Sequence, residues 1–441
     1  MADGSSFPDR GPGLPLWLDG LAPVAGLAAA PPAKADLVVI GAGYTGLNAA
    51  LEVARGGRSV VALDAAEFGR GCSGRNGGQI STSVKPGLGK LAEKFGPERA
   101  RAIRGEGRAA LDWIEDFLAR EGIDCDFVRA GRFHAAHTPA AYETLAREAA
   151  EAEKAEGIPF EAVPRAEQRR ELGTDYYHGG VVYPRHASLH PAKYLRGLTE
   201  RAAAAGVSIV HRCAALGVER TADGFRVRTE KGVIAARDVA IATNGYTTAL
   251  TPWLRRRVIP IGSYIIATEE LPPDLMERLF PVPDRIVSDT RKVVYYYRAS
   301  PDRRRVVFGG RVSAAETDPG ISGPKLRAEM VRLFPELATA AISHSWLGTV
   351  AYSFDEMAHA GVHDGMHYAM SYCGSGVSMA SWLGMRMGQK ILGRAEGRTA
   401  FDNLPFPTRP FYTGRPWFLP AAVAFYRWRD RFEHDRAAGA A

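Results

Sequence analysis

The feature that most constrains the fold lies at residues 35–66. The apolar run "ADLVVIG" is followed by the turn "GAGYTG", by a helical pattern that reaches "EVARGG", and by a second apolar run, "RSVVALDA". Apolar runs of strand length predict strands that are buried on both faces of a parallel sheet. A strand, a turn, a helix and a second strand form a βαβ unit, so the sequence predicts an α/β fold.

The turn after the first strand has the spacing of a dinucleotide-binding motif. Gly41 allows the tight turn, Gly43 lets a pyrophosphate approach the backbone, and Gly46 lets the helix pack on the strand. Asp64 ends the second strand 18 residues after Gly46, where a carboxylate can accept from a ribose 2′-hydroxyl. This context disfavours a purely structural turn, and the acid argues against NADP. The motif leaves NAD and FAD open.

The stretch "GRGCSGRNGGQ" separates these two cofactors. It begins five residues after Asp64, where an NAD domain would continue with another strand and helix. A flavoprotein instead needs a chain that runs along the pyrophosphate toward the flat flavin ring, and close contact with that ring requires residues without Cβ. The stretch therefore favours FAD, with glycines at 71, 74, 77 and 78 and with Ser73, Asn76 and Gln79 as hydrogen-bond donors.

The rest of the chain predicts two domains that are interleaved along the sequence. With 441 residues, the chain has room for two or three domains. Strands of the buried, parallel type are interspersed with strands of the alternating, antiparallel type, such as "RVVFGGRVS". We expect an irregular lead-in (1–33), a discontinuous FAD-binding domain (34–130, 188–252 and 344–398), a substrate domain (131–187 and 253–343) and a C-terminal tail (399–441).

Composition narrows the class of protein. The four cysteines lie far apart without a CxxC pair, which predicts neither a disulfide framework nor a metal site and fits a reducing compartment. The net charge is +7, but no basic cluster has the aromatic neighbours of a nucleic-acid site, so no nucleic-acid partner is expected. No apolar run is long enough to span a bilayer, and we expect a cytoplasmic protein.

The C-terminal stretch "PWFLPAAVAFYRWRDRFE" combines aromatic residues with a basic end. Two placements are open for it. Docking on the protein's own surface is favoured, because the apolar part is short and contains a proline. Peripheral contact with a membrane interface is the less favoured placement.

Several motifs together resemble one flavoprotein superfamily. "VVIGAGYTGLNAAL", "VVALDA" and "GRGCSGRNGGQ" resemble the D-amino-acid-oxidase-type FAD-dependent oxidoreductases, and the form "SGRNGGQ" most resembles their gamma-glutamylputrescine oxidoreductase branch. "GGVVYPRHASLHPAKYLRGL", "IATNGYT", "RVVFGGR" and "SYCGSGVSMASWLG" are similar to later landmarks of that superfamily, in the same order. The resemblance covers about residues 35–395. It implies a Rossmann-like FAD-binding domain interleaved with an antiparallel-sheet substrate domain.

The resemblance also implies a set of FAD-binding residues. They are Gly41, Gly43, Tyr44, Thr45 and Gly46 at the pyrophosphate, Asp64 and Ala65 at the adenosine ribose, Ala215 at the adenine, Cys72, Ser73, Gly77, Gly78 and Gln79 along the flavin, and Gly374, Ser375, Gly376 and Val377 at its pyrimidine ring. The last four open a helix whose positive end would stabilise reduced flavin.

The chain departs from the sarcosine-oxidase-type members of the superfamily at three positions. Gly348 stands where those members carry the cysteine that bonds to the flavin, so we expect FAD to be held without a covalent link. Gln79 and Ser378 stand where they carry an arginine and a lysine that hold the substrate carboxylate. A small α-amino acid bound in that way is therefore disfavoured.

Four side chains are candidates for roles at the reacting centre. Arg75 is either an electrostatic group near the flavin or a bridge between loops. Tyr352 is the best aromatic candidate for an amine site, and Arg311 either meets an anionic substrate tail or makes a surface ion pair. Tyr297 shares one strand face with Tyr295, whereas Tyr296 and Arg298 share the other. Which of these two faces lines the substrate site stays open.

The function we predict is FAD-dependent oxidation of the C–N bond of a primary or secondary amine, of the gamma-glutamylputrescine or N-alkylated kind. A hydride would pass to flavin N5, and the imine would hydrolyse to a carbonyl compound and an amine. The acceptor of the electrons is oxygen or a quinone. The alternatives are a dehydrogenase of D-amino or N-methyl amino acids and a flavin-dependent tRNA-modifying protein.

Overall fold

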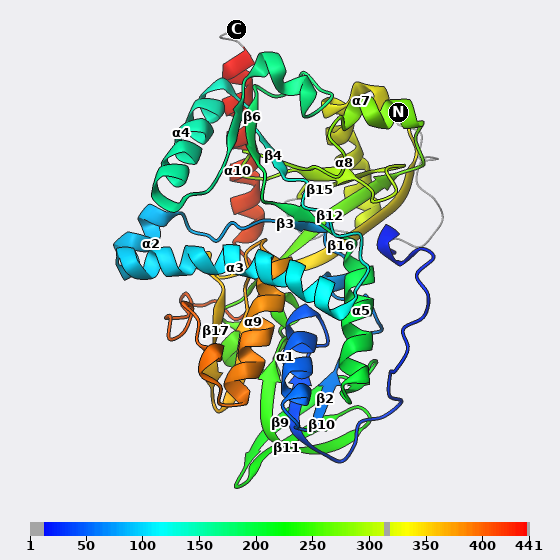
Figure 1. The fold of residues 1–441 in the computed structure, drawn as a ribbon, viewed down its shortest axis with the longest axis vertical. Coiled ribbons are helices and arrows are strands. Elements are labelled where there is room, and N and C mark those ends of the chain that lie inside the picture. Colours follow the sequence, from blue (N-terminus) through cyan, green and yellow to red (C-terminus); the bar gives the residue numbers. More distant parts are fainter. Residues whose placement is uncertain (1–12, 313–317, 439–441) are drawn as a thin grey trace.

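The computed structural model describes residues 13–312 and 318–438. Within them the strands form two eight-stranded sheets and a two-stranded sheet of β3 (Gln79–Ile80) and β7 (Ala187–Ser188). Figure 1 shows one large sheet in each half of the elongated molecule, with α3 (Pro97–Glu121) running across between the halves. Each large sheet is assembled from segments that are not adjacent in sequence, which confirms the predicted interleaved fold.

The first sheet contains the predicted βαβ unit. Five of its strands are parallel, in the order β18-β11-β1-β2-β8, and β17 pairs antiparallel with β18 at one edge. The long strand β11 also forms an antiparallel meander with β10 and β9. The strands are β1 (Lys34–Ile40), β2 (Val60–Leu63), β8 (Ser208–Val210), β9 (Ala215–Thr221), β10 (Gly224–Thr229), β11 (Gly232–Ile241), β17 (His359–His363) and β18 (Met366–Met370).

Both faces of this sheet are covered, which explains the unbroken apolar run of β1. Leu37 and Val39 belong to the core formed with the helices, whereas Val38 and Ile40 belong to the core formed with the meander. The helices of this half are α1 (Tyr44–Arg55), α2 (Leu88–Phe95), α3, α5 (Pro191–Ala204) and α9 (Gly376–Ile391), and the short α6 (Pro252–Arg255) follows the meander.

The second sheet has the order β16-β12-β15-β14-β13-β4-β6-β5. All neighbouring pairs are antiparallel except β13 and β4, which are parallel. Its strands are β4 (Arg132–Ala135), β5 (Glu161–Val163), β6 (Gly180–Tyr183), β12 (Ile259–Thr268), β13 (Ile286–Asp289), β14 (Tyr296–Ala299), β15 (Val306–Gly310) and β16 (Ile342–Tyr352). Because β16 pairs with β12, residues 344–352 lie in this sheet, although the predicted boundary grouped them with the FAD-binding domain.

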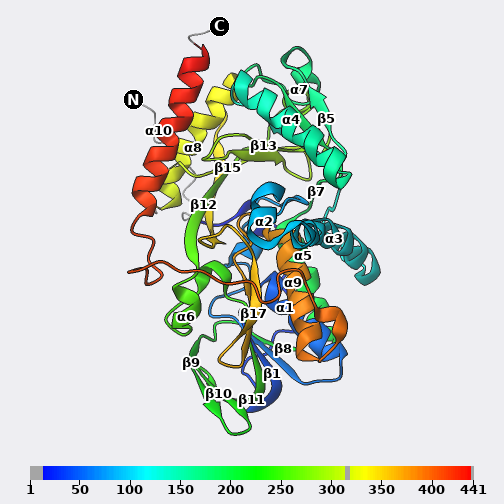
Figure 2. The ribbon, with the colours of Figure 1, turned by 90° about the vertical axis from the view of Figure 1, so that its left-hand side faces the viewer.

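Helices flank the second sheet on its outer sides. The helix α8 (Pro319–Leu333) packs on one face through an apolar core, and α4 (Pro139–Glu156) packs on β6. Figure 2 shows α8 and α4 on opposite sides of this half, with α10 (Leu419–Ala438) outside α8. The helix α7 (Pro273–Leu279) completes the half. No helix in the described ranges is both long enough and apolar enough to cross a membrane.

The lead-in is fixed to the junction between the halves by one tryptophan. Trp17, in a short 3-10 helix (Leu16–Leu18), is 1% exposed and packs edge-on against Trp346 and His190. Its indole Nε1 donates to the backbone oxygen of Asn76 over 2.8 Å. The lead-in therefore contacts the glycine-rich loop (residues 71–79) directly.

Candidate FAD and substrate site

The carboxyl ends of the parallel strands meet at one edge of the first sheet. Ligands of open parallel sheets bind outside this edge. Five connections converge there, namely residues 41–46 after β1, 64–66 after β2, 211–213 after β8, 242–246 after β11 and 371–376 after β18. Four of the five contain predicted FAD-binding residues or the "IATNGYT" landmark.

Two helices begin side by side at this edge. In α1 and in α9 the first turn has no acidic residue. The N-cap of α1 is Gly43, which has no side chain, and the side chain of Ser375, the N-cap of α9, makes no capping bond. The helices pack so closely that a Cβ added at Gly384 would lie 2.3 Å from the backbone oxygen of Thr45. Thr45 Oγ1 and the Tyr372 hydroxyl lie 2.6 Å apart. Uncapped N-termini direct N–H groups and positive dipole ends toward an anion, and a pyrophosphate suits them.

The turn that precedes α1 has the geometry expected of the glycine motif. Gly41 has φ of 109°, and a Cβ there would lie 2.7 Å from the backbone oxygen of Ala242. A Cβ at Gly46 would lie 1.9 Å from the backbone oxygen of Gly41. The glycine-rich loop crosses this turn, because Ser73 Oγ accepts a hydrogen bond from the backbone N–H of Tyr44 over 3.0 Å.

Asp64 lies at the end of β2, beside the glycine turn. Its two carboxylate oxygens accept from the backbone N–H groups of Ala42 (3.2 Å) and Ala66 (3.0 Å). Burial raises the pKa of Asp64. A carboxylate offers about four acceptor positions, so Asp64 retains capacity for a ribose hydroxyl. Ala65 follows it and is exposed.

The connection that follows β8 passes close to Asp64. The N–H of Cys213 donates to the backbone oxygen of Asp64 over 2.9 Å. Ala215, the residue expected at the adenine, lies two positions further on and begins β9, where it pairs with Thr229. The placement thus brings this connection to the nucleotide end of the site, with Cys213 in contact with Asp64.

Two amides of the glycine-rich loop bind backbone rather than facing outward. Asn76 donates to the backbone oxygens of Cys72 (3.1 Å) and Ser73 (3.2 Å) and accepts from the N–H of Gly78 (2.9 Å), so it braces its own loop. Gln79 Nε2 donates to the backbone oxygens of Val287 (3.3 Å) and Tyr297 (3.1 Å). Gln79 therefore ties the loop to the second sheet.

Arg75 is a buried cation between this loop and β16. Its Nη1 donates to the backbone oxygen of Leu347 over 3.2 Å, and burial lowers the pKa of its guanidinium. Among the described residues, its Nε and Nη2 have no hydrogen-bond partner. Buried donors without partners are costly, and an anionic group bound at this position would satisfy them.

Gly348 of β16 faces the same loop. A Cβ added at Gly348 would lie 3.3 Å from Cys72 Sγ and 3.4 Å from the Cβ of Arg75. Burial raises the pKa of the Cys72 thiol to about 11. The sulfur that lies beside this position is therefore protonated at neutral pH.

The turn between β18 and α9 closes the other end of the site. Ser371, Cys373 and Gly374 all have positive φ (63°, 51° and 99°), an uncommon backbone that surrounding packing must hold in place. Ser375 Oγ donates to the backbone oxygen of Ser83 over 2.7 Å, which fixes the turn beside residues 83–85. Gly376 and Val377 then begin α9.

Tyr352 lies at this turn, at the end of β16. A Cβ at Gly374 would lie 3.6 Å from the Tyr352 hydroxyl. Burial raises the pKa of Tyr352, so the phenol is neutral. The ammonium group of Lys85 lies 5.8 Å from the centre of the Tyr352 ring. The structure thus brings Tyr352 to the predicted flavin segment and adds a cation beside it.

The second sheet presents Tyr296, not Tyr297, to the glycine-rich loop. A Cβ at Gly77 would lie 2.9 Å from the Tyr296 ring, whose hydroxyl lies 2.7 Å from Ser263 Oγ. Tyr297 points into the core beneath α8, where it stacks on Phe308 and donates to the Tyr177 hydroxyl. The face with Tyr296 is thus the one at the junction, and the Tyr297 side chain lies away from it.

Both arginines of this part of the chain, Arg298 and Arg311, are buried and donate to backbone oxygens. Arg298 is 1% exposed and donates to the backbone oxygens of Gly78, Leu189 and Ala299, so it holds the loop in place. Arg311 follows β15, is buried, and donates from Nη1 to the backbone oxygen of Gly262 over 2.9 Å.

Lys85, Asn244 and Tyr372 were not among the predicted site residues, and Tyr296 was predicted only as part of one of two possible strand faces. Asn244 Oδ1 accepts from the N–H of Ser371 over 2.9 Å and so positions the turn before α9. The sequence could have indicated Asn244, because this residue follows the buried strand β11 at the same sheet edge as Gly41. Lys85 carried no signal, because only the fold brings residues 83–85 to the turn before α9.

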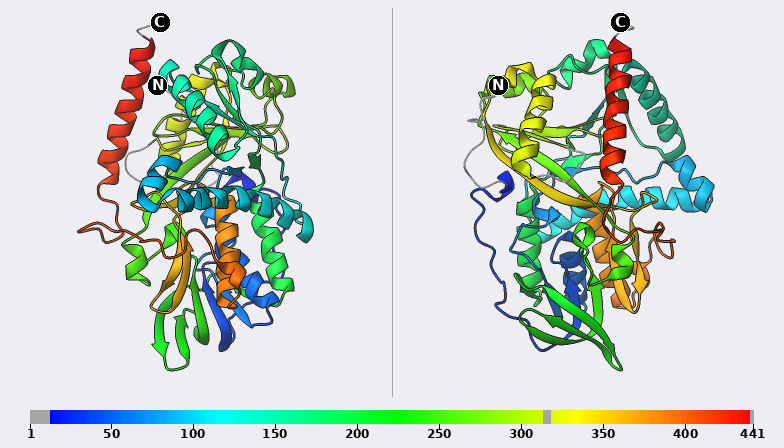
Figure 3. Two further views of the ribbon diagram at one scale, coloured as in Figure 1. Left: turned by 60° about the vertical axis from the view of Figure 1, so that its left-hand side comes forward. Right: turned by 180° about the vertical axis from the view of Figure 1, so that it is seen from behind.

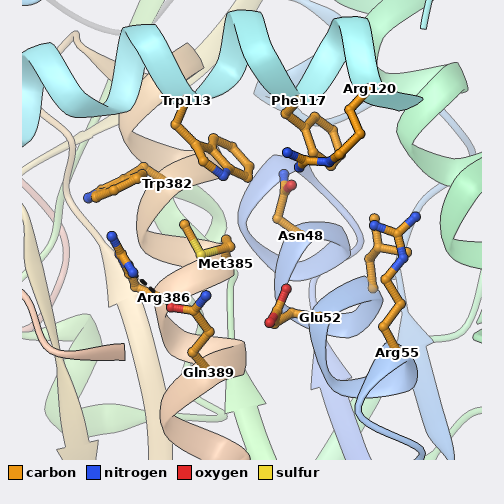
Figure 4. A pocket seen from close by; sticks show the side chains of 11 residues that line it. Asn48, Glu52, Arg55, Trp113, Phe117, Arg120, Trp382, Met385, Arg386 and Gln389 are labelled. Atoms are coloured by element: carbon orange, nitrogen blue, oxygen red, sulfur yellow. Dashed lines mark hydrogen bonds between the residues drawn. The ribbon is translucent and has the colours of Figure 1, made fainter. Parts of the chain in front are cut away.

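One cavity lies away from this edge of the sheet. It has a volume of about 240 Å³ and opens between α1, α3 and α9 (Figure 4). Its lining from α1 comes from Asn48, Leu51, Glu52 and Arg55, which follow the glycine turn by one to three helical turns. This cavity is therefore separate from the converging segments.

The converging residues fit FAD. Two uncapped helix N-termini suit the pyrophosphate, Asp64 suits a ribose, and the unpartnered donors of Arg75 suit an anionic group. A Cβ at Gly41 or Gly77 would meet the protein itself, at Ala242 and at the Tyr296 ring, so these glycines let the segments of the site pack closely together.

Comparisons with known proteins agree with this assignment. The model of the family described as "FAD dependent oxidoreductase" matches residues 36–390. The chain is 33% identical to the probable oxidoreductase OrdL of Rhizobium meliloti (strain 1021) over 405 residues, which cover 90% of this chain and 93% of that protein. It is 30% identical to the gamma-glutamylputrescine oxidoreductase of Escherichia coli (strain K12) over 401 residues, with the same coverage of 90% and 93%.

The fold has a counterpart among solved structures. The glycine oxidase of Geobacillus kaustophilus superposes with a TM-score of 0.68 at 20% identity, covering 86% of this chain and 99% of that one. The resemblance inferred from the motifs is thereby confirmed, together with the predicted cofactor. The chain belongs to the family of FAD-dependent oxidoreductases, and it is an enzyme of that family.

Proposed function

We propose that this enzyme oxidises the C–N bond of a primary or secondary amine whose acidic group, if present, lies away from the reacting carbon. The observation that carries the proposal is the hydrogen bonding of the Gln79 side chain. Its amide nitrogen is bound to two backbone oxygens of the second sheet. The other position expected to hold a carboxylate, Ser378, is neutral and 1% exposed. Neither can hold an α-carboxylate as an arginine and a lysine would.

The surroundings favour a neutral amine. Burial raises the pKa of Tyr296 and Tyr352 and raises the pKa of the Cys72 and Cys373 thiols to about 11, so all four groups are uncharged at neutral pH. An environment of low polarity lowers the pKa of a bound ammonium and yields the free base. Bound FAD would accept the two electrons that are removed when the amine is oxidised to an imine. Water then hydrolyses the imine to a carbonyl compound and an amine.

Lys85 is the group that we propose meets a distant acidic tail. It is exposed, it lies beside Tyr352, and in the described residues it makes no ion pair. Arg298 is unsuited to this role, because its donors bind backbone oxygens inside the protein. A flexible ammonium group at the edge of the site suits a carboxylate that is several bonds from the reacting carbon.

Two substrates and two variants test this proposal. Lys85→Gln should raise KM for a γ-glutamylated diamine by roughly two- to fivefold, the value of one exposed charge pair, and change kcat little. An N-alkylated amine without a carboxylate should show no change. Lys90→Gln, which removes an exposed lysine five residues away in α2, is the matched control. An equal effect on both substrates would contradict the role of Lys85. Formation of the carbonyl product by the wild type tests the amine-oxidising activity itself, independently of Lys85.

The final electron acceptor, oxygen or a quinone, is distinguished by the rate of reoxidation. Reduced enzyme mixed with air-saturated buffer should recover its yellow colour within seconds if it is an oxidase. Slow recovery that a soluble quinone accelerates would identify a dehydrogenase.

A further inference from the structure

The C-terminal helix α10 docks on the protein through a mixed face, which buries Leu419 and Val423 together with Asp430. Figure 3 shows it along the outside of the second-sheet half. The carboxylate of Asp430 is 7% exposed and accepts from the backbone N–H groups of Lys292 (3.0 Å) and Val293 (2.9 Å). Arg427 Nη1 donates to the backbone oxygen of Val312 over 2.5 Å. These bonds fix the rotation of the helix about its axis.

The opposite face of α10 is aromatic and exposed. Phe425, Trp428 and Phe432 are 54%, 61% and 53% exposed. Their spacing places them in one stripe along the helix. Neighbouring ring centres are 6.1 Å and 5.7 Å apart, so the stripe is continuous. A helix that packs on its own protein normally turns its large apolar side chains inward, whereas α10 buries Val423 and Asp430 and exposes Trp428.

The loop before α10 extends this surface. Phe411 is 93% exposed and Trp417 is 69% exposed. Every exposed phenylalanine and tryptophan in the described ranges belongs to residues 411–432. Large exposed apolar groups that gather in one segment mark an interaction surface. We call residues 409–432 the aromatic segment.

The aromatic segment is also basic. It contains arginines at positions 409, 415, 427, 429 and 431, and its one acid, Asp430, is buried against backbone N–H groups. In α10, Arg427 is bound to the backbone of Val312 and Arg429 pairs with Glu433 over 3.0 Å, so Arg431 is the arginine of the helix that makes no ion pair among the described residues. Arginines beside a stripe of tryptophan and phenylalanine are typical of helices that lie in the plane of a membrane interface. Anionic lipid headgroups attract such arginines.

We propose that the aromatic segment anchors this enzyme to the surface of an anionic membrane. The stripe of Phe425, Trp428 and Phe432 enters the boundary between headgroups and acyl chains, and α10 lies parallel to the surface. Charge argues for lipid rather than for a second copy. A symmetric contact between two copies places the same surface against itself, so Arg431 would approach like charge, whereas anionic lipid supplies the opposite charge.

Co-sedimentation with vesicles tests the proposal on the full-length, FAD-loaded protein. Vesicles of phosphatidylcholine alone are compared with vesicles that also contain phosphatidylglycerol. The stripe variant carries Phe425→Ser, Trp428→Ser and Phe432→Ser. The matched control carries Leu216→Ser, Val233→Ser and Val362→Ser, which remove three exposed apolar side chains from the meander and the sheet edge of the other half. Retained yellow colour and melting temperature verify that both fold.

The proposal predicts binding to the anionic vesicles, weakened about tenfold or more in the stripe variant and unchanged in the control. Arg431→Gln should weaken it by roughly fivefold. The proposal is overturned if the protein binds no vesicle, if it binds both lipids equally, or if the stripe variant binds like the wild type. A dimer in light scattering that the stripe variant abolishes, without vesicle binding, would assign the surface to a second copy instead.

Discussion

The indole Nε1 of Trp346 donates a hydrogen bond to the backbone oxygen of Arg75 over 2.9 Å. Trp346 belongs to β16 of the second sheet, and Arg75 belongs to the glycine-rich loop of the first half. Both side chains are buried, at 0% and 6% exposure. The loop that is expected to lie along the flavin is thus held by the second sheet.

Trp346→Phe should loosen this loop. The ring is kept, but the Arg75 oxygen loses its buried donor, at a cost of about 1–3 kcal/mol. We expect a lower melting temperature and weaker FAD binding, measured by flavin fluorescence on titration of the apoprotein. Trp382→Phe is the control, because it removes the bond from Trp382 Nε1 to Glu106 in α3, away from the loop. Equal FAD affinity in the two variants would contradict the positioning role of Trp346.

Asp64→Ala should weaken FAD binding by about tenfold or more, because a charge-assisted hydrogen bond is worth about 1.5–3 kcal/mol. Asp36→Ala is the matched control. Asp36 also accepts hydrogen bonds from a neighbouring residue, the N–H and Oγ of Ser59, but at the opposite end of the parallel strands. If both variants bound FAD with wild-type affinity, Asp64 would have no role at the ribose.

FAD should be released completely by acid precipitation. Position 348 is glycine, and the thiol beside it, Cys72, has a pKa raised to about 11 by burial, whereas attachment requires a thiolate. The supernatant absorbance at flavin wavelengths measures the release. Chromophore that stays in the pellet of the wild type but not of Cys72→Ser would show a covalent link through Cys72.

Stability should fall as the pH drops below about 6.5. Burial lowers the pKa of His190 to about 4, and its Nδ1 accepts from the N–H of Lys193 at the start of α5. Because the folded pKa lies below the unfolded one, the stabilisation is complete above the unfolded pKa and is lost as the pH falls toward 4. The loss is roughly 3 kcal/mol.

Urea unfolding between pH 4.5 and 7.5 measures this dependence. His190→Asn keeps a capping acceptor but does not titrate, so its stability should vary less with pH. Four other histidines whose pKa burial lowers remain in the variant and contribute to the residual slope, namely His134, His186, His211 and His367. The same pH dependence in wild type and variant would contradict the role of His190.

The fold and the position of the glycine turn beside Asp64 were predictable, because short-range patterns determine them. The apolar run of β1, the glycines from Gly41 to Gly46 and the acid at Asp64 lie within 31 residues of one another. The order of buried and alternating strands predicted two interleaved sheets. The predicted domain boundary differed from the sheet pairing at residues 344–352. These residues belong to the long strand β16, and no local sequence pattern reveals that it pairs with β12.

The substrate end was less predictable, because side chains from distant segments form it. Period-two alternation separated Tyr296 from Tyr297 but could not tell which face meets the glycine-rich loop. Only the packing of α8 decides this, because its apolar face covers Tyr297. Asn76 and Gln79 have the right chemistry for flavin donors, yet their amides bind backbone oxygens that the fold brings near.

The most direct test of the proposed function is anaerobic reduction of the bound flavin in a stopped-flow instrument. The enzyme is mixed with γ-glutamylated or N-alkylated amines and, separately, with D-alanine, glycine and sarcosine, and the loss of flavin absorbance is followed. The account predicts faster bleaching by the amines, since neither Gln79 nor Ser378 can hold an α-carboxylate. Faster bleaching by the small amino acids would contradict it.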